Sequence, residues 1–153
     1  MISETTMTNS VKRVDFTDEW RTKLSRAATI VAERDGQDGV AQELEQSIDS
    51  GRAFLFSAGK AGFFVLEPMT FEGKKAVNMT FCWSTERYGM IKYFPTVNSL
   101  AQKINAHYII GYTKNEHLPE YYERIGFTPK GKNDSGLYVF VREVNYHERR
   151  RIE

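Results

Sequence analysis

The residues best suited to chemistry lie in one short segment, residues 115–127, which reads NEHLPEYYERIGF. The segment holds a histidine, His117, and two adjacent phenols, Tyr121 and Tyr122. A phenol has an ordinary pKa of ~10, so it is protonated at neutral pH and can donate a proton in a reaction. The same aromatic pair would also suit the packing of a helix on a sheet. The residue types leave both roles open.

Metal and thiol chemistry have less support in the sequence. The other histidines, His107 and His147, have no partners at the spacings of metal ligands. The single cysteine, Cys82, has no second cysteine to pair with, and no histidine or aspartate pattern marks it as a nucleophile. We therefore expect no metal and a packing role for Cys82. The lack of an internal disulfide fits a reducing compartment.

Length and composition suit one domain. Of the 153 residues, 41% are hydrophobic and 13% aromatic, and the net charge of +1 gives no field that would select nucleic acid. We expect a single domain over residues 1–153, with a polar lead-in at 1–10 and a charged, solvated tail at 145–153 that includes Arg149–Arg151. No signal-peptide pattern is found, and no apolar run approaches the roughly 18 residues of a membrane span. These features favour a cytoplasmic protein without nucleic-acid or membrane partners.

Hydrophobic periodicity predicts the elements of the first half of the chain. Apolar residues at helical spacing over Asp18–Arg34 predict a helix that Thr17 can cap and Gly36 can end. A strand should precede this helix, and a second helix and three strands should follow it. Because the connections between these three strands are too short for parallel crossovers, we expect an antiparallel meander. The additional elements are the strand Val11–Phe16, the helix at about Val40–Ser50, and the strands Arg52–Ser57, Ala61–Thr70 and Lys75–Trp83.

A helix at about Thr96–Ala106 and a strand at Tyr108–Thr113 come after the meander. A strand, a helix and a strand in this order form a parallel unit, so Tyr108–Thr113 should lie beside Lys75–Trp83 and parallel to it. A helix at Pro119–Ile125 should then lead into a final hairpin. Pro119 suits the first turn of that helix, and Gly126 suits the left-handed position that ends it. The hairpin comprises Phe127–Lys130, a turn at Gly131–Gly136, and Leu137–Val144.

The segment 115–127 resembles the C-terminal signature of the GNAT acyltransferase superfamily, roughly N-x-x-A-x-x-F-Y-x-x-x-G-F. The predicted order β-α-α-β-β-β-α-β-α-β-β is also that of the GNAT fold, a mixed sheet of the α+β class, and the resemblance then covers about residues 10–144. Leu118 replaces the usual alanine of the signature and Tyr121 the usual phenylalanine. The matching positions are Asn115, Tyr121, Tyr122, Gly126 and Phe127.

The resemblance implies acetyl-CoA as co-substrate, bound where the fourth and fifth strands separate. It implies that Tyr122 donates a proton to the departing thiolate of CoA, and that a carboxylate, Glu86 or else Glu67, serves as the base for an amine acceptor. The loop into the third helix would hold the pyrophosphate, because amides at a helix N-terminus bind anions. The residues implied for cofactor binding are Arg87, Gly89, Met90, Lys92 and Asn115.

Three residues depart from the family's pattern in this loop. Glu86 stands where glutamine or arginine is usual, and Ile91 stands where glycine or alanine is usual. Pro95 should kink or break a helix that begins at Gly89.

These departures leave a second function open. The first function is that of a CoA-dependent N-acyltransferase, whose acceptor could also be an amine on a host or partner protein. In the second, the chain is a non-catalytic GNAT-like protein that binds protein partners, such as a phage-encoded virion or assembly protein, which would place it in the virion.

Overall fold

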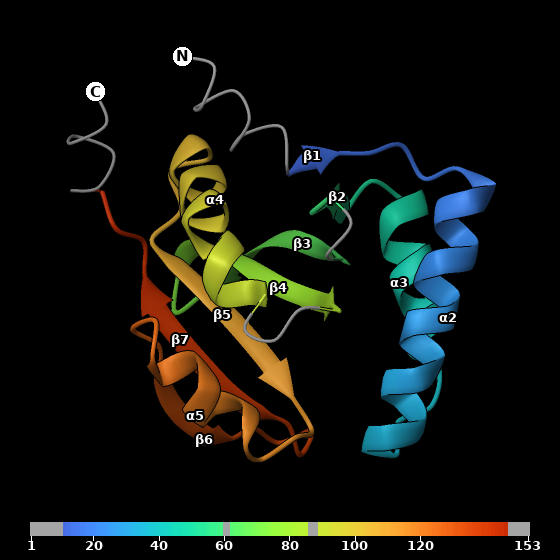
Figure 1. Cartoon of the computed structure of the whole chain (residues 1–153). Coiled ribbons are helices and arrows are strands. Elements are labelled where there is room, and N and C mark those ends of the chain that lie inside the picture. Colours follow the sequence, from blue (N-terminus) through green and yellow to red (C-terminus); the bar gives the residue numbers. More distant parts are fainter. Residues whose placement is uncertain (1–10, 60–61, 86–88, 147–153) are drawn as a thin grey trace. The chain divides into compact units, whose positions relative to one another are not determined.

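A computed structural model describes residues 11–59, 62–85 and 89–146 of the chain, with the backbone alone at 89–91. Seven strands form one mixed sheet in the order β1-β2-β3-β4-β5-β7-β6 (Figure 1). The predicted α+β class and order of elements are confirmed. The elements are β1 Lys12–Arg13, α2 Asp18–Asp35, α3 Val40–Asp49, β2 Phe54–Ser57, β3 Gly62–Phe71, β4 Lys74–Ser84, α4 Gly89–Lys103, β5 Tyr108–Thr113, α5 Leu118–Glu123, β6 Thr128–Lys132 and β7 Tyr138–Glu143.

Contacts group the chain into two compact units. The first comprises Met1–Glu67 with Thr80–Glu86, and the second comprises Pro68–Met79 with Arg87–Glu153. Strands β3 and β4 therefore contribute residues to both units. The single domain expected over residues 1–153 stays a prediction, and the lead-in 1–10 and residues 147–153 of the tail lie outside the described residues.

In the first unit, the ends of α2 form as the sequence predicts. The side chain of Thr17 accepts a hydrogen bond from the Trp20 amide at 3.3 Å and so caps the helix. Gly36 ends the helix in the left-handed conformation at φ 68°, and its amide donates to the carbonyl of Ala32. Helices α2 and α3 pack with β2, β3 and the end of β4 around a core that includes Leu24, Leu44, Leu55, Phe63, Val65 and Phe81.

A bidentate ion pair joins α2 to α3. The two terminal nitrogens of Arg21 lie 2.9 and 3.0 Å from the carboxylate oxygens of Asp49, and one of them also lies 3.3 Å from Glu45. Hydrogen bonding to Arg21 lowers the pKa of Asp49 below its ordinary value of 3.8. Because Arg21 is near the start of α2 and Asp49 is at the end of α3, the pair fixes the two helices as antiparallel neighbours.

In the second unit, β5 is the central strand. It pairs in parallel with β4, with Ala76–Asn78 opposite Tyr108–Ile110, and antiparallel with β7 on its other side. The parallel neighbours that the sequence predicts on either side of the α4 crossover are thus confirmed. The β3–β4 turn has positive φ at both Glu72 and Gly73, the geometry of a tight hairpin turn.

Helix α4 begins at Gly89, so the predicted start at Thr96 is wrong. Pro95 lies inside the helix, where a missing amide and a ring clash cost ~3 kcal/mol or more. The apolar face runs on through the proline, because Tyr93, Phe94 and Val97 are all buried at helical spacing. Burial of these side chains offsets the cost of the proline. The predicted end at Ala106 is also too late, since Asn105 takes the left-handed conformation at φ 58°.

The chain beyond β7 is held to α4 by buried amides. Asn98, which is 3% exposed, donates to the carbonyl of Asn145 and accepts from its amide, both at 2.9 Å. Gln102 also donates to that carbonyl, and the hydroxyl of Tyr146 donates to the carbonyl of Ala106 at 2.7 Å. The first two residues of the predicted solvated tail therefore fasten α4 to the sheet.

Both helices of the second unit pack on one face of β5 and β7 (Figure 1). On that face Gly111 of β5 lies opposite Phe140 of β7, and a Cβ at Gly111 would clash with the Cζ end of the Phe140 ring. The ring therefore lies directly over the glycine. The other face carries Ile110, Val139 and Val141 as a separate apolar cluster.

We predict that Gly111→Ala destabilises the protein by about 1–3 kcal/mol, because the added methyl group must push Phe140 out of place. Chemical denaturation measures the change. Phe140→Leu in the same chain should relieve part of it, so the double variant should lose less stability than the sum of the two single variants. Strictly additive losses would contradict the contact.

We predict that Asp49→Asn lowers Tm at neutral pH and that this difference shrinks as the pH falls below about 4. A carboxylate whose pKa is depressed by folding stabilises the protein above its unfolded pKa, and this stabilisation is lost as pH falls through the folded pKa. Tm measured against pH tests it. Arg21→Met should give the same profile, and combining both substitutions should add little. A Tm difference independent of pH would argue against the pair.

Candidate active site

A short turn carries the chain from the end of β5 into α5. The hydroxyl of Thr113 accepts a hydrogen bond from the Asn115 amide at 3.0 Å. The side-chain oxygen of Asn115 in turn accepts from the His117 amide at 2.9 Å, and its carbonyl accepts from the Leu118 amide at 3.2 Å. Asn115 therefore builds the turn that starts the helix, a common use of asparagine. The predicted contact of Asn115 with the cofactor stays a prediction.

The end of α5 matches the predicted pattern of a glycine in the left-handed conformation. Gly126 has φ 91°, and the amide of Phe127 turns back to the carbonyl of Tyr122 at 3.2 Å. Pro119 lies in the first turn of α5, where its missing amide costs no helical hydrogen bond. Proline and glycine thus set the two ends of α5 and fix where Tyr122 falls.

The ring of Tyr122 lies in an aromatic cluster and is 3% exposed. It stacks on Phe140 at 4.7 Å between centroids and meets Phe127 and Tyr121 edge-on at 5.4 and 5.2 Å. The packing role that the sequence left open for Tyr122 is therefore real. A role for its hydroxyl in proton donation stays a prediction.

Three of the predicted cofactor residues lie in the first turn of α4, namely Gly89, Met90 and Lys92. The amides of a first helical turn have no acceptor within the helix, and this turn contains no acidic residue. Because α4 connects two parallel strands, it starts at the end of the sheet where β5 finishes. The fold thus brings this turn and Asn115 to the same end of β5. The ammonium group of Lys92 lies 5.4 Å from the ring centroid of Tyr93.

The predicted base and one predicted phosphate ligand, Glu86 and Arg87, lie outside the described residues. The alternative base, Glu67, is half-buried on β3, and Cys82 is half-buried on β4. His117 is exposed and 3.6 Å from Glu116. Within residues 11–59, 62–85 and 89–146, no group of three or more His, Cys, Asp or Glu side chains could hold a metal ion.

Two further residues of the second unit were not identified from the sequence. Burial raises the pKa of the Tyr112 phenol, which lies on β5 between Gly111 and Thr113. Arg142 lies on the helix-covered face of β7 and hydrogen-bonds to the carbonyl of Ile125 at the end of α5. Side chains alternate between the two faces of a strand, so the sequence could have placed Arg142 on the same face as Phe140. It could not have shown that Arg142 bonds to the carbonyl of Ile125.

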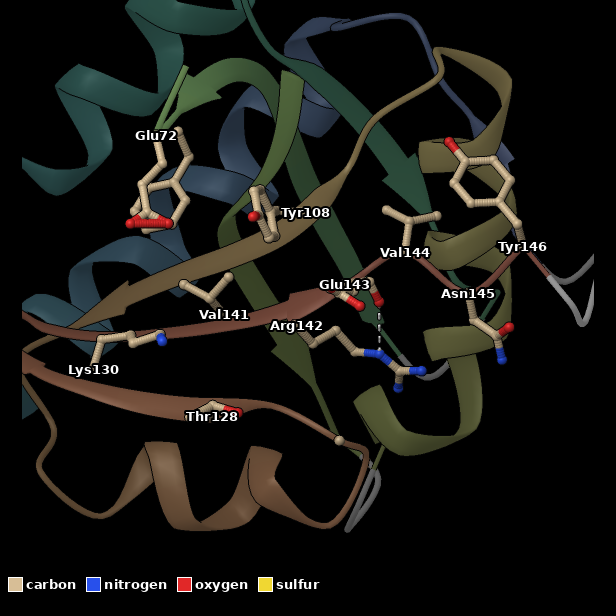
Figure 2. A pocket seen from close by; sticks show the side chains of 12 residues that line it. Glu72, Tyr108, Thr128, Lys130, Val141, Arg142, Glu143, Val144, Asn145 and Tyr146 are labelled. Carbon is tan, nitrogen blue, oxygen red and sulfur yellow. Dashed lines mark hydrogen bonds between the residues drawn. The ribbon is translucent and has the colours of Figure 1, made fainter. Parts of the chain in front are cut away.

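A separate hollow of about 760 Å³ lies at the opposite end of β5 (Figure 2). Phe71 and Tyr108 line it together, 5.6 Å apart and edge-on, and Glu72 and Lys130 also belong to its wall. Tyr108 begins β5, whereas α4 starts at the level where β5 ends. Gly126 and Arg142 also line this hollow, whereas the described residues Lys92, Asn115 and Tyr122 do not.

In the part of the chain that the structure describes, no helix has the length and apolar character needed to cross a membrane.

Comparison with known proteins gives a structural likeness without a sequence match. No family model matches the chain, and no curated protein matches it in sequence. Among solved structures, an aminoglycoside 6'-N-acetyltransferase complexed with coenzyme A superimposes with a TM-score of 0.67 at 12% identity, over 88% of this chain and 97% of that one. The N-acyl amino acid synthase FeeM from uncultured soil microbes gives 0.66 at 16% identity, over 92% of each chain.

A GNAT-family acetyltransferase from Listeria monocytogenes gives a TM-score of 0.62 at 20% identity, over 87% of this chain and 93% of that one. These likenesses span nearly the whole of both chains in each case. At such low identity they speak to architecture, and site chemistry must be argued separately. The chain has the fold of the GNAT acetyltransferases.

Proposed function

We propose that the chain is a divergent member of the GNAT superfamily and transfers an acyl group from acetyl-CoA to an amine. The observation that carries this proposal is the position of three features at one end of β5: the first turn of α4, the Asn115 turn and the start of α5. In the GNAT superfamily, the corresponding features hold the cofactor and the proton donor.

The first turn of α4 is the group of residues that would bind the pyrophosphate. Its backbone amides can donate hydrogen bonds to a phosphate, and the ammonium group of Lys92 adds a positive charge that attracts it. The sequence alone raises the objection that Pro95 would kink or break a helix that begins at Gly89. The helix starts there nonetheless, and this supports the proposal.

In the proposed reaction, each proposed residue takes part in one proton transfer. The amine nitrogen attacks the thioester carbonyl, the new C–N bond forms and the C–S bond breaks. The thiolate that leaves takes a proton from the hydroxyl of Tyr122, and the amine gives its proton to a carboxylate, for which Glu86 and Glu67 are the candidates. Stacking on Phe140 supports this role because a fixed ring holds its hydroxyl in one place.

One observation favours the second function, a GNAT-fold protein without catalysis that binds protein partners. Tyr122 is 3% exposed and contacts three other aromatic rings, so packing alone accounts for its presence. A chain that had lost catalysis would keep such a ring for stability. The two functions differ in whether acetyl-CoA binds and in whether the hydroxyl of Tyr122 matters.

We predict that acetyl-CoA raises Tm, because a ligand that binds only the folded state stabilises it by mass action. At ~100 times the dissociation constant the gain should be about 2.7 kcal/mol. Lys92→Ala should weaken binding in calorimetric titration, and Lys103→Ala, in the last turn of the same helix, should leave it unchanged. If Tm does not change at millimolar acetyl-CoA, the result would support the second function, a GNAT-fold protein without catalysis.

We predict that Tyr122→Phe lowers the rate of acetyl transfer by ~10²–10⁴-fold, the usual contribution of a general acid. The ring and its stacking remain, so acetyl-CoA affinity should hardly change and stability should fall by no more than ~0.5–1.5 kcal/mol. Tyr121→Phe, the matched control on the next residue, should keep most of the rate. If Tyr122→Phe is nearly as active as wild type, another group is the acid, with His117 the next candidate.

A further inference from the structure

Arg142 reaches from β7 to both helices of the second unit. Its terminal nitrogen Nη1 donates a hydrogen bond to the carbonyl of Ile125, just past the end of α5. Its guanidinium carbon lies 4.9 Å from the ring centroid of Phe94 in α4. Its Nε donates to the carbonyl of Glu143 at 3.3 Å, as Figure 2 shows, which directs the side chain along the sheet. A single side chain therefore contacts α4, the turn that ends α5 and the neighbouring residue of its own strand.

Gly126 makes room for this arrangement. A Cβ at Gly126 would lie 3.1 Å from Nη1 of Arg142 and 3.3 Å from its guanidinium carbon, closer than almost all real contacts of this kind. The glycine also has φ 91°, which side-chain-bearing residues rarely adopt. The glycine at the end of α5 is therefore required both by its backbone conformation and by the approach of the guanidinium.

The contact with Ile125 acts on the part of α5 that carries Tyr122. The amide of Ile125 donates to the carbonyl of Tyr122 at 3.0 Å, so two successive hydrogen bonds lead from the guanidinium to the tyrosine backbone. A cation at a helix C-terminus also interacts favourably with the partial negative charge of the last carbonyls. A lysine would keep the charge but not the planar fork, which lies over the Phe94 ring while it donates to Ile125.

We propose that Arg142 is a positioning residue for Tyr122: it holds the end of α5 against α4 and so fixes the place of the tyrosine hydroxyl. This inference rests on the proposed acyl transfer. Arg142 itself touches α5 through a backbone carbonyl and acts on the reaction only through Tyr122. Stacking on Phe140 limits motion of the tyrosine ring perpendicular to its plane. The Arg142 contact limits motion of the helix that carries it.

The test compares Arg142→Met with Arg142→Lys and with a matched control, Lys132→Met. Methionine keeps most of the apolar stem of Arg142 and removes the guanidinium. The control removes a second cation–aromatic contact, that of Lys132 with Tyr138 at 5.1 Å, which involves neither helix. Each variant is measured for the kcat of acetyl transfer and the KM for acetyl-CoA, in the wild-type chain and in the Tyr122→Phe chain.

We expect Arg142→Met to lower kcat by on the order of 10²-fold, the cost of a small displacement of a reacting group, with little change in KM. In the Tyr122→Phe chain the same substitution should change kcat by only about twofold, because the hydroxyl it positions is already gone. Arg142→Lys should fall between wild type and Arg142→Met, and it carries the same comparison if Arg142→Met does not fold. Lys132→Met should match wild type.

An equal loss of kcat in both chains would overturn the inference, since Arg142 would then act independently of Tyr122. Hydrogen exchange of the amides at 118–127 provides a readout that needs no activity. Exchange should be faster in Arg142→Met than in Lys132→Met, and equal exchange would show that Arg142 does not hold α5. If the wild-type chain transfers no acetyl group, the proposed function and the link to catalysis both fail, while exchange still decides whether Arg142 holds the helix.

Discussion

The stacking of Tyr122 on Phe140 is the contact on which the second unit depends. Phe140 can take its place only because Gly111 opposite it has no side chain, and Tyr122 then covers the other side of the ring at 4.7 Å. Phe127 meets both rings edge-on and also meets Phe94 of α4 at 5.5 Å. One aromatic cluster thus joins the sheet, α5 and α4. The helix of only 6 residues that carries Tyr122 could not be stable without it.

Packing and catalysis make compatible demands on Tyr122. An aromatic ring held by stacking and edge-on contacts loses the freedom to turn, which is the preorganisation that a proton donor needs. A buried ring is therefore no objection to a catalytic hydroxyl, nor does it require one. The two proposed functions share this cluster and differ only in what the hydroxyl does.

In helix α4, the burial of apolar side chains outweighs the tendency of a proline to end a helix. Pro95 should end a helix, yet the buried residues Tyr93, Phe94 and Val97 continue the apolar face on both sides of it. The amides of Asn98 and Gln102 then fix the helix to Asn145, beyond the last strand. The cost of the proline is spread over contacts far apart in the sequence. As a result the helix starts early enough to present its first turn at the end of β5.

The sequence by itself determined the element order, the class of the fold, the caps at Thr17 and Gly36, and the parallel pairing across the α4 crossover. These follow from periodicity, turn residues and connection lengths, which are local properties of the chain. It also located the segment that carries Tyr122, but not whether that ring is buried. The start of α4, the partner of Arg142 and the fastening of Asn145 to Asn98 were decided only by the tertiary structure. Each depends on residues distant in sequence meeting in space, and a local pattern does not record which side chains will meet.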